Sequence, residues 1–155
     1  MDDEETLSFV REQAVEARCV FAVCTDALVL GAAGLLKGRK VTTPWAAFDL
    51  LIYFDGVPVN ERVVIDGNLF TTAGVSAGID GALRVAALLR GSQTAQEIQL
   101  GIQYAPEPPF NSGTPESGSP EGLAAVRSRL EKVSDARLAT ARRTGATASN
   151  NRRDS

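Results

Sequence analysis

The chain changes from an extended to a helical pattern at Val20-Phe21-Ala22-Val23-Cys24-Thr25-Asp26-Ala27. The apolar residues before Cys24 predict a strand over 18–23 that is buried on both faces. The apolar run after it predicts a helix over 25–36, closed by the glycine and cations of 37–39. Cys24 therefore lies where a strand becomes a helix, and the free N–H groups of a helix N-terminus favour a thiolate. This placement makes nucleophilic chemistry at Cys24 the first hypothesis.

The composition narrows the class of protein. A length of 155 residues predicts one domain, and a net charge of −3 gives no basic footprint for nucleic acid. The longest apolar run, 27–36, is far too short for a membrane span. The first five residues are acidic after Met1, which fits neither a signal peptide nor a transit peptide. We therefore expect neither a nucleic-acid nor a membrane partner.

The cysteine and histidine content limits the chemistry. Cys19 and Cys24, on one extended strand, would lie about 16 Å apart, which is beyond the reach of a disulfide. Unpaired cysteines predict a reducing, cytoplasmic setting. The chain has no histidine, which removes the usual general base, the cysteine–histidine pair and most zinc sites. Catalysis by Cys24 would need a different proton carrier.

The rest of the chain alternates strand and helix patterns, which predicts an α/β layered fold. The expected strands are 40–43, 57–59, 62–65 and 69–72, with a hairpin turn at Asp66-Gly67. The expected helices are 7–14, a helix starting at Pro44, 79–89, 94–100 and 123–133, with a flexible loop of small residues over 73–78. We expect one domain over 1–133, containing a proline-rich loop at 105–120. The polar residues 134–155 have little to bury and are expected to be a mostly disordered tail.

Several short motifs in this order resemble the ThiJ/PfpI superfamily, which has the class I glutamine amidotransferase-like fold. The cysteine elbow of 23–39, Val23-Cys24-Thr25-Asp26-Ala27-Leu28 and onward, carries most of the resemblance. Further motifs resemble the isonitrile hydratase branch of that family: Val64-Ile65-Asp66-Gly67-Asn68, Gly74-Val75-Ser76-Ala77-Gly78-Ile79-Asp80, Ile98-Gln99-Leu100, Tyr104-Ala105-Pro106-Glu107-Pro108-Pro109-Phe110 and Gly113-Thr114-Pro115. The resemblance extends over roughly residues 7–130.

The resemblance implies a flavodoxin-like three-layer sandwich with a parallel sheet and a cysteine elbow, usually assembled as a homodimer. It also implies hydration of an isonitrile to an N-substituted formamide. Cys24 would be the nucleophile that attacks the terminal isonitrile carbon, and Thr25 could hydrogen-bond the thiolate or the substrate. No metal or organic cofactor is implied.

The sequence departs from the family pattern in three places. Asp26 replaces a glycine, Pro44 replaces a histidine, and the family's N-terminal βαβ portion is missing. That portion carries an acidic residue facing the cysteine and a glycine-rich loop. Asp26 could repel a thiolate, act as a replacement acid or base, or be a first-turn acid without a chemical role. The strand over 18–23 is also left with few candidate neighbours on one edge.

Three further residues are candidates for a substrate pocket: Gly74, Val75 and Trp45. Trp45 could equally be a core or dimer contact, and Gly74 could simply permit a tight backbone. Two other functions remain open. The chain could be an inactive or ligand-binding remnant of the fold, or it could have another activity of the superfamily, such as glyoxalase, deglycase or peptidase. Those activities generally depend on a histidine or glutamate near the cysteine.

Overall fold

A short, mainly parallel sheet forms the centre of the molecule. The computed structural model describes the backbone of residues 1–150 and the side chains of residues 1–145. Strand β1 (Val20–Val23) pairs in parallel with β5 (Leu69–Thr72), and β5 pairs antiparallel with β4 (Val63–Asp66), giving the order β1-β5-β4. A second, parallel pair joins β2 (Lys40–Val41) to β3 (Val57–Pro58). The β4–β5 connection turns at Gly67, with φ of 57°, which confirms the predicted hairpin.

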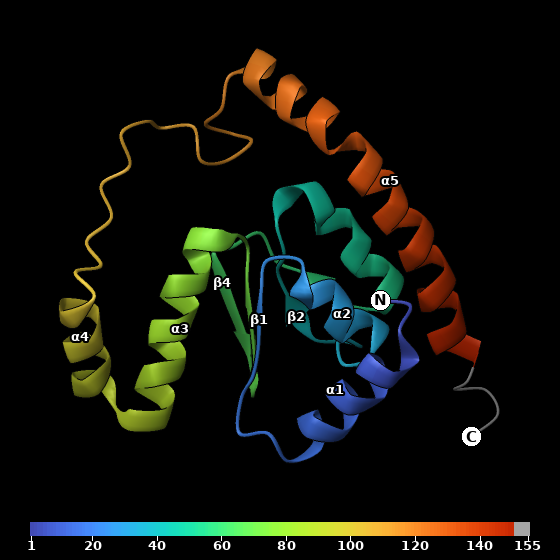
Figure 1. Ribbon diagram of the computed structural model, residues 1–155, viewed down its shortest axis with the longest axis horizontal. Coiled ribbons are helices and arrows are strands. Elements are labelled where there is room, and N and C mark those ends of the chain that lie inside the picture. Colours follow the sequence, from blue (N-terminus) through green and yellow to red (C-terminus); the bar gives the residue numbers. More distant parts are fainter. Residues whose placement is uncertain (151–155) are drawn as a thin grey trace.

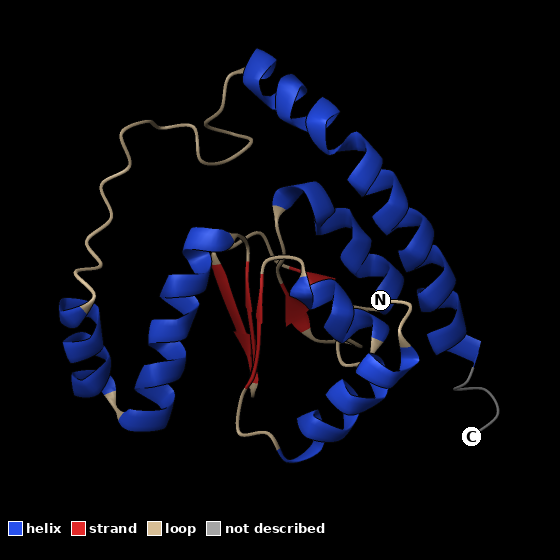
Figure 2. Ribbon diagram, viewed as in Figure 1, coloured by secondary structure: helices blue, strands red, loops and turns tan. Residues whose placement is uncertain are grey.

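Helices cover both faces of this sheet, as Figures 1 and 2 show. Helices α3 (Val75–Arg90) and α4 (Ser92–Gly101) lie on one side. The other side carries α1 (Glu4–Glu16), α2 (Asp26–Ala32), the 3-10 helix η1 (Trp45–Phe54) and α5 (Pro120–Asn150). The result is the predicted three-layer α/β arrangement.

The larger core lies between the sheet and the layer of α2 and η1. Leu28, Leu36, Leu51 and Val41 have less than 2% of their surface exposed. Helix α2 and η1 lie so close together that a Cβ added at Gly31 would be 2.5 Å from the Phe54 ring. The three leucines come from segments predicted as helices, and Val41 comes from a predicted strand. Burial of their apolar surface stabilises the packing of this layer on the sheet.

The region of small residues at 73–78 is mostly helix, not the predicted flexible loop. Helix α3 begins at Val75, directly after the extended Gly74. A Cβ at Gly78 would lie 2.8 Å from a Val23 methyl, and one at Gly81 would lie 2.5 Å from a Thr72 methyl. The small residues are therefore needed where α3 packs closely on β1 and β5. The helix after Cys24 is also shorter than predicted, since α2 ends at Ala32 and turns follow to residue 38.

The expected disorder of residues 134–155 is wrong for the part that the structure describes. Helix α5 continues through Asn150, and residues 151–155 lie outside the described chain. Ala141 is fully buried, and Gly145 lies against the main-chain carbonyl of Tyr53 in η1. A few small residues thus anchor α5 on η1 and α2 although the segment is polar on average. The irregular, proline-rich loop before α5 ends at residue 119, close to its predicted limit.

Strand β1 has one edge without a partner among residues 1–150. Its pairing with β5 uses the other edge, in the register Val20 opposite Leu69 and Val23 opposite Thr72. Three of its four residues remain half-buried, and Ala22 is buried. This matches the sequence expectation that one edge of the strand lacks candidate neighbours. In the described part of the chain, the structure contains no helix long and apolar enough to cross a membrane.

Candidate functional site

Cys24 sits on a sharp turn at the carboxyl end of β1. Its φ is 61°, in the left-handed region that residues with a side chain seldom adopt. The Cys24 N–H donates to the carbonyl oxygen of Thr72 at 3.1 Å, and the Cys24 carbonyl oxygen accepts from Thr43 Oγ1 at 2.9 Å. Strained backbone of this kind is characteristic of functional sites. The turn lifts the half-buried Cys24 out of the strand, which confirms the cysteine elbow.

Thr25 and Asp26 begin the helix that follows the elbow. Thr25 is the N-cap of α2 and is half-buried, while Asp26 is the first helical residue and is exposed. A carboxylate in the first turn interacts favourably with the positive end of the helix dipole. Among the described residues, neither side chain forms a hydrogen bond with the Cys24 thiol. The structure therefore places all three predicted residues at one turn without fixing a chemical role for Asp26.

Gly74 and Val75 lie at the carboxyl end of the neighbouring strand β5. Thr72, which accepts the hydrogen bond from Cys24, precedes Gly74 by two residues. Gly74 caps α3, nothing lies within 4 Å of a Cβ added there, and Val75 is 83% exposed. In open α/β sheets, ligands bind beyond the carboxyl ends of the strands, and Cys24 and Gly74 share such an edge.

Four buried threonines lie on the two segments that contact the elbow, a feature that the sequence reasoning missed. Thr42, Thr43, Thr71 and Thr72 are each at most 1% exposed. Thr71 Oγ1 accepts from the main-chain N–H of Thr42 at 3.0 Å, which joins the segment after β2 to β5. The Thr72 hydroxyl is buried without a hydrogen-bond partner in the described chain. The two pairs of adjacent threonines were visible in the sequence, but nothing there showed that Thr43 and Thr72 contact Cys24.

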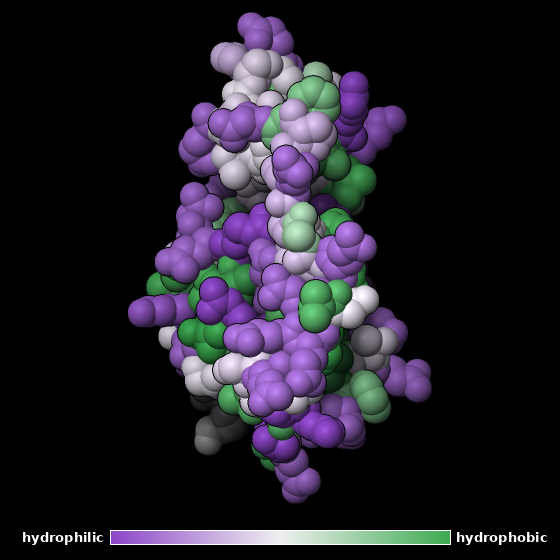
Figure 3. Space-filling model, turned by 90° about the vertical axis from the view of Figure 1, so that its left-hand side faces the viewer, coloured by the Kyte–Doolittle hydropathy of each residue, from purple (hydrophilic) through white to green (hydrophobic). Residues whose placement is uncertain are grey.

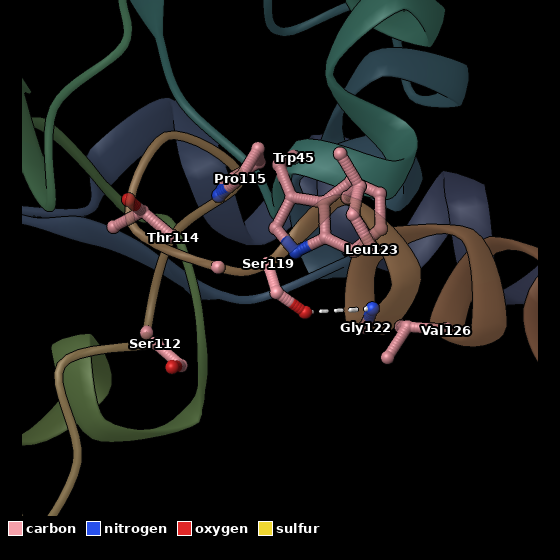
Figure 4. A pocket seen from close by; sticks show the side chains of 10 residues that line it. Trp45, Ser112, Thr114, Pro115, Ser119, Gly122, Leu123 and Val126 are labelled. Atoms are coloured by element: carbon pink, nitrogen blue, oxygen red, sulfur yellow. Dashed lines mark hydrogen bonds between the residues drawn. The ribbon is translucent and has the colours of Figure 1, made fainter.

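Trp45 lines a pocket away from Gly74 and Val75. This cavity of about 290 Å³ lies between the start of η1, the loop over 112–119 and the first turns of α5. Figure 4 shows Trp45 beside Leu123. The side-chain hydroxyl of Ser119, which also lines the pocket, accepts a hydrogen bond from the Gly122 N–H at 3.0 Å. On α5, the Arg127 guanidinium lies 6.0 Å from the centre of the Trp45 ring, in cation–π range. Trp45 follows Thr43 by two residues, so the pocket and the elbow are linked through a short segment.

The second cysteine differs from Cys24 in its surroundings. Cys19 and Cys24 are both free thiols. Cys19 precedes β1, and burial raises the pKa of its thiol, which disfavours the reactive thiolate. Cys24 differs from Cys19 because it lies on the strained turn at the end of β1. Beyond this site, a polar cluster joins Asp80 on α3 to Arg62 and Tyr104.

A family model agrees with this architecture. The model of the DJ-1/PfpI family matches residues 1–88. Among curated proteins, the chain is 54% identical over 129 residues to isonitrile hydratase from Pseudomonas putida, an alignment that covers 83% of this chain and 57% of that protein. The chain thus spans a little over half the length of this relative.

Solved structures give the same result. A ThiJ/PfpI family protein from Pseudomonas syringae superposes with a TM-score of 0.86 at 39% identity, covering 90% of this chain and 57% of that one. DJ-1beta from Drosophila melanogaster superposes with a TM-score of 0.60 at 25% identity, covering 68% and 56%. These matches confirm the flavodoxin-like fold and the predicted resemblance. With a family model that covers more than half of its residues, the chain belongs to the DJ-1/PfpI family.

Proposed function

We propose that the chain carries the cysteine half of an isonitrile hydratase, a lyase that adds water to an isonitrile to give an N-substituted formamide. The observation that carries this proposal is the 54% identity to isonitrile hydratase over 129 residues, 83% of this chain. Because the chain spans 57% of that relative, activity of the whole protein is part of the proposal.

The proposed reaction has two steps. The Cys24 sulfur forms a bond to the terminal isonitrile carbon, and that carbon takes up one proton, giving a thioimidate, Cys–S–CH=N–R. Water then adds to the same carbon and the C–S bond breaks, which releases the formamide and returns the thiol. Thr25, adjacent to the nucleophile, would hydrogen-bond the thiolate or the substrate. No other reactant is consumed, so the reaction needs only a group that moves protons.

Asp26 is the candidate proton carrier in a chain without histidine. It is exposed and lies two residues after Cys24, where it can exchange protons with water. Asp26→Asn distinguishes this role from a purely structural one. Loss of an acid–base group predicts a rate lower by about a hundredfold or more. A carboxylate that only complements the helix dipole predicts an unchanged rate, with a loss of about 0.3–1 kcal/mol in the free energy of unfolding.

The test of the function is formation of N-cyclohexylformamide from cyclohexyl isocyanide. We expect the wild-type chain to release formamide and Cys24→Ala to release none above the rate without protein. Cys19→Ala is the matched control, because it removes the other thiol and should keep the activity. Formamide released by Cys24→Ala at the wild-type rate would exclude the cysteine mechanism.

A non-catalytic, ligand-binding role is the second candidate, and the open edge of β1 favours it. Among residues 1–150 no strand covers the edge of β1 that faces away from β5, so the elbow is not enclosed on that side. Unreactive Cys24 with retained binding of an isonitrile would support this role. Glyoxalase, deglycase and peptidase activities are weaker alternatives, and each of them predicts no formamide from cyclohexyl isocyanide.

We also propose a homodimer in a reducing, cytoplasmic setting. Both cysteines are free, which is compatible with such a compartment. A second copy would cover apolar surface that the single chain leaves exposed, such as Val75 and Leu88 on α3. Figure 3 shows hydrophobic side chains scattered among hydrophilic ones on the side of the molecule that carries α3 and α4.

A further inference from the structure

Two hydrogen bonds hold the backbone on either side of the Cys24 Cα atom. The N–H of Cys24 belongs to the peptide plane that precedes it and donates to the Thr72 carbonyl oxygen at 3.1 Å. The carbonyl of Cys24 belongs to the following peptide plane and accepts from Thr43 Oγ1 at 2.9 Å. Both partners come from other parts of the chain, one on β5 and one 19 residues away in the segment between β2 and η1. Together the two planes define the backbone conformation of Cys24.

This conformation needs such support. A φ of 61° is rare for a residue with a side chain and persists where surrounding contacts over-determine it. The bond to Thr72 continues the ladder between β1 and β5, so it fixes only the plane before the turn. The plane after the turn is held by the Thr43 hydroxyl. Thr43 is 1% exposed, so water cannot easily compete for this hydrogen bond.

We infer that Thr43 is a positioning residue for Cys24. By donating to the Cys24 carbonyl oxygen, its buried hydroxyl keeps the elbow in the conformation that presents the thiol to an electrophile. The inference rests on the proposed function for its catalytic meaning, but the reactivity of the thiol can be measured without an isonitrile. A thiol displaced by about 1 Å from its productive position reacts far more slowly, which sets the size of the expected effect.

Thr42 provides a matched control within the same segment. It is as buried as Thr43, at 1% exposure, and its hydrogen bond to Thr71 Oγ1 comes from its main-chain N–H. Thr42→Val therefore makes the same chemical change at an equally buried position without removing a bond to Cys24. Any effect of a lost buried hydroxyl on the fold should be shared by Thr42→Val and Thr43→Val.

The experiment measures two rates on the full chain. The first is alkylation of Cys24 by iodoacetamide at pH 7, followed on the peptide that contains Cys24 by mass spectrometry. The second is formamide release from cyclohexyl isocyanide, resolved into kcat and KM. The variants are Thr43→Val, which keeps the shape, and the pair Thr43→Ser and Thr43→Ala, which differ from each other by one hydroxyl. The second pair still isolates the hydroxyl if Thr43→Val does not fold.

We expect alkylation and kcat to fall about tenfold or more in Thr43→Val and Thr43→Ala, with KM within about twofold of wild type. Thr43→Ser and Thr42→Val should stay within about twofold of wild type in both rates. Equal rates in Thr43→Ser and Thr43→Ala, or an equal loss in Thr42→Val, would overturn the inference. A chain that shows the expected alkylation pattern but releases no formamide would support the positioning role and contradict the proposed function.

Discussion

At the scale of the residue, Cys24 carries a conformational cost that a simple strand-to-helix junction would not require. Its left-handed backbone is held from both sides, by a hydrogen bond that its N–H donates to β5 and by one that its carbonyl oxygen accepts from Thr43. The left-handed conformation costs an L residue roughly 1–2 kcal/mol, whereas glycine adopts it freely. The left-handed conformation of Cys24 therefore lowers the stability of the fold while it presents the thiol, a combination that is common at active sites.

This cost predicts that Cys24→Gly is more stable than Cys24→Ala. Glycine avoids the left-handed penalty but loses more entropy on folding, which leaves a net advantage of about 0.5–1 kcal/mol. Urea denaturation of both variants measures the difference. At the next residue, Thr25, φ is −76°, so the order should reverse and Thr25→Ala should be the more stable variant. Equal stabilities for the two Cys24 variants would show that the turn is not strained.

The sequence identified Cys24, Thr25 and Asp26 as neighbours because their proximity is local. Thr43 and Thr72 escaped notice because their contacts with Cys24 depend on how strands distant in the sequence come together. Threonine is common in strands whatever its role, so its identity alone does not distinguish a positioning residue from an ordinary one. Residue roles that arise from tertiary contacts are beyond the reach of local pattern.

At the scale of the element, most strands and helices follow from periodicity, and two of the exceptions share one cause. The small residues of 73–78 suggested a flexible loop, and the polar residues from 134 onward suggested a segment with little to bury. In the structure, small residues of both segments lie where elements pack most closely, as with Gly78 against Val23 and Gly145 against Tyr53. Small side chains at a close contact bury little surface of their own, so hydrophobicity does not reveal them.

The packing of α5 can be tested at Ala141. Ala141→Asp places a carboxylate at a site with 0% exposure, and we expect it to lower the free energy of unfolding by about 2–4 kcal/mol. Ala139→Asp makes the same change at an exposed position of the same helix and should cost less than about 0.5 kcal/mol. Thermal denaturation followed by circular dichroism measures both. Identical transitions would mean that the segment after residue 133 does not pack on η1.

At the scale of the whole molecule, one polar cluster ties the sheet layer to both helices of the outer layer. The Asp80 carboxylate on α3 accepts from Arg62, just before β4, at 2.8 and 2.6 Å. It also accepts from the Tyr104 hydroxyl, just after α4, at 2.7 Å. Burial raises the pKa of Asp80, but the hydrogen bonds from Tyr104 and Arg62 outweigh it and hold the pKa below its ordinary value.

This cluster predicts a pH-dependent contribution to stability. Because the folded pKa of Asp80 lies below the unfolded value, the charged carboxylate stabilises the fold above about pH 4. That contribution is lost as the pH falls through the folded pKa. We expect Asp80→Asn to cost about 1–2 kcal/mol at pH 7 and progressively less below pH 4. Asp49 is exposed, so Asp49→Asn should change the free energy of unfolding little at either pH. A loss for Asp80→Asn that does not vary with pH would contradict a stabilising role of the charged Asp80 carboxylate.

The arrangement of strands was only partly accessible from the sequence. The alternation of strands and helices predicted the layers, but the order β1-β5-β4 and the separate β2–β3 pair depend on long-range pairing. The unpaired edge of β1 was anticipated because a strand apolar on both faces needs two neighbours. That edge lies beside the elbow, so the reactivity of Cys24 has to be tested in this molecule.

The most direct test is the intact mass of the protein after rapid acid quenching during reaction with cyclohexyl isocyanide. We predict a species heavier than the free chain by the full mass of the isocyanide, located on the peptide that contains Cys24 and absent from Cys24→Ala. The species should decay as formamide appears. Release of formamide without any adduct, or an adduct on Cys19 in place of Cys24, would contradict nucleophilic catalysis by Cys24.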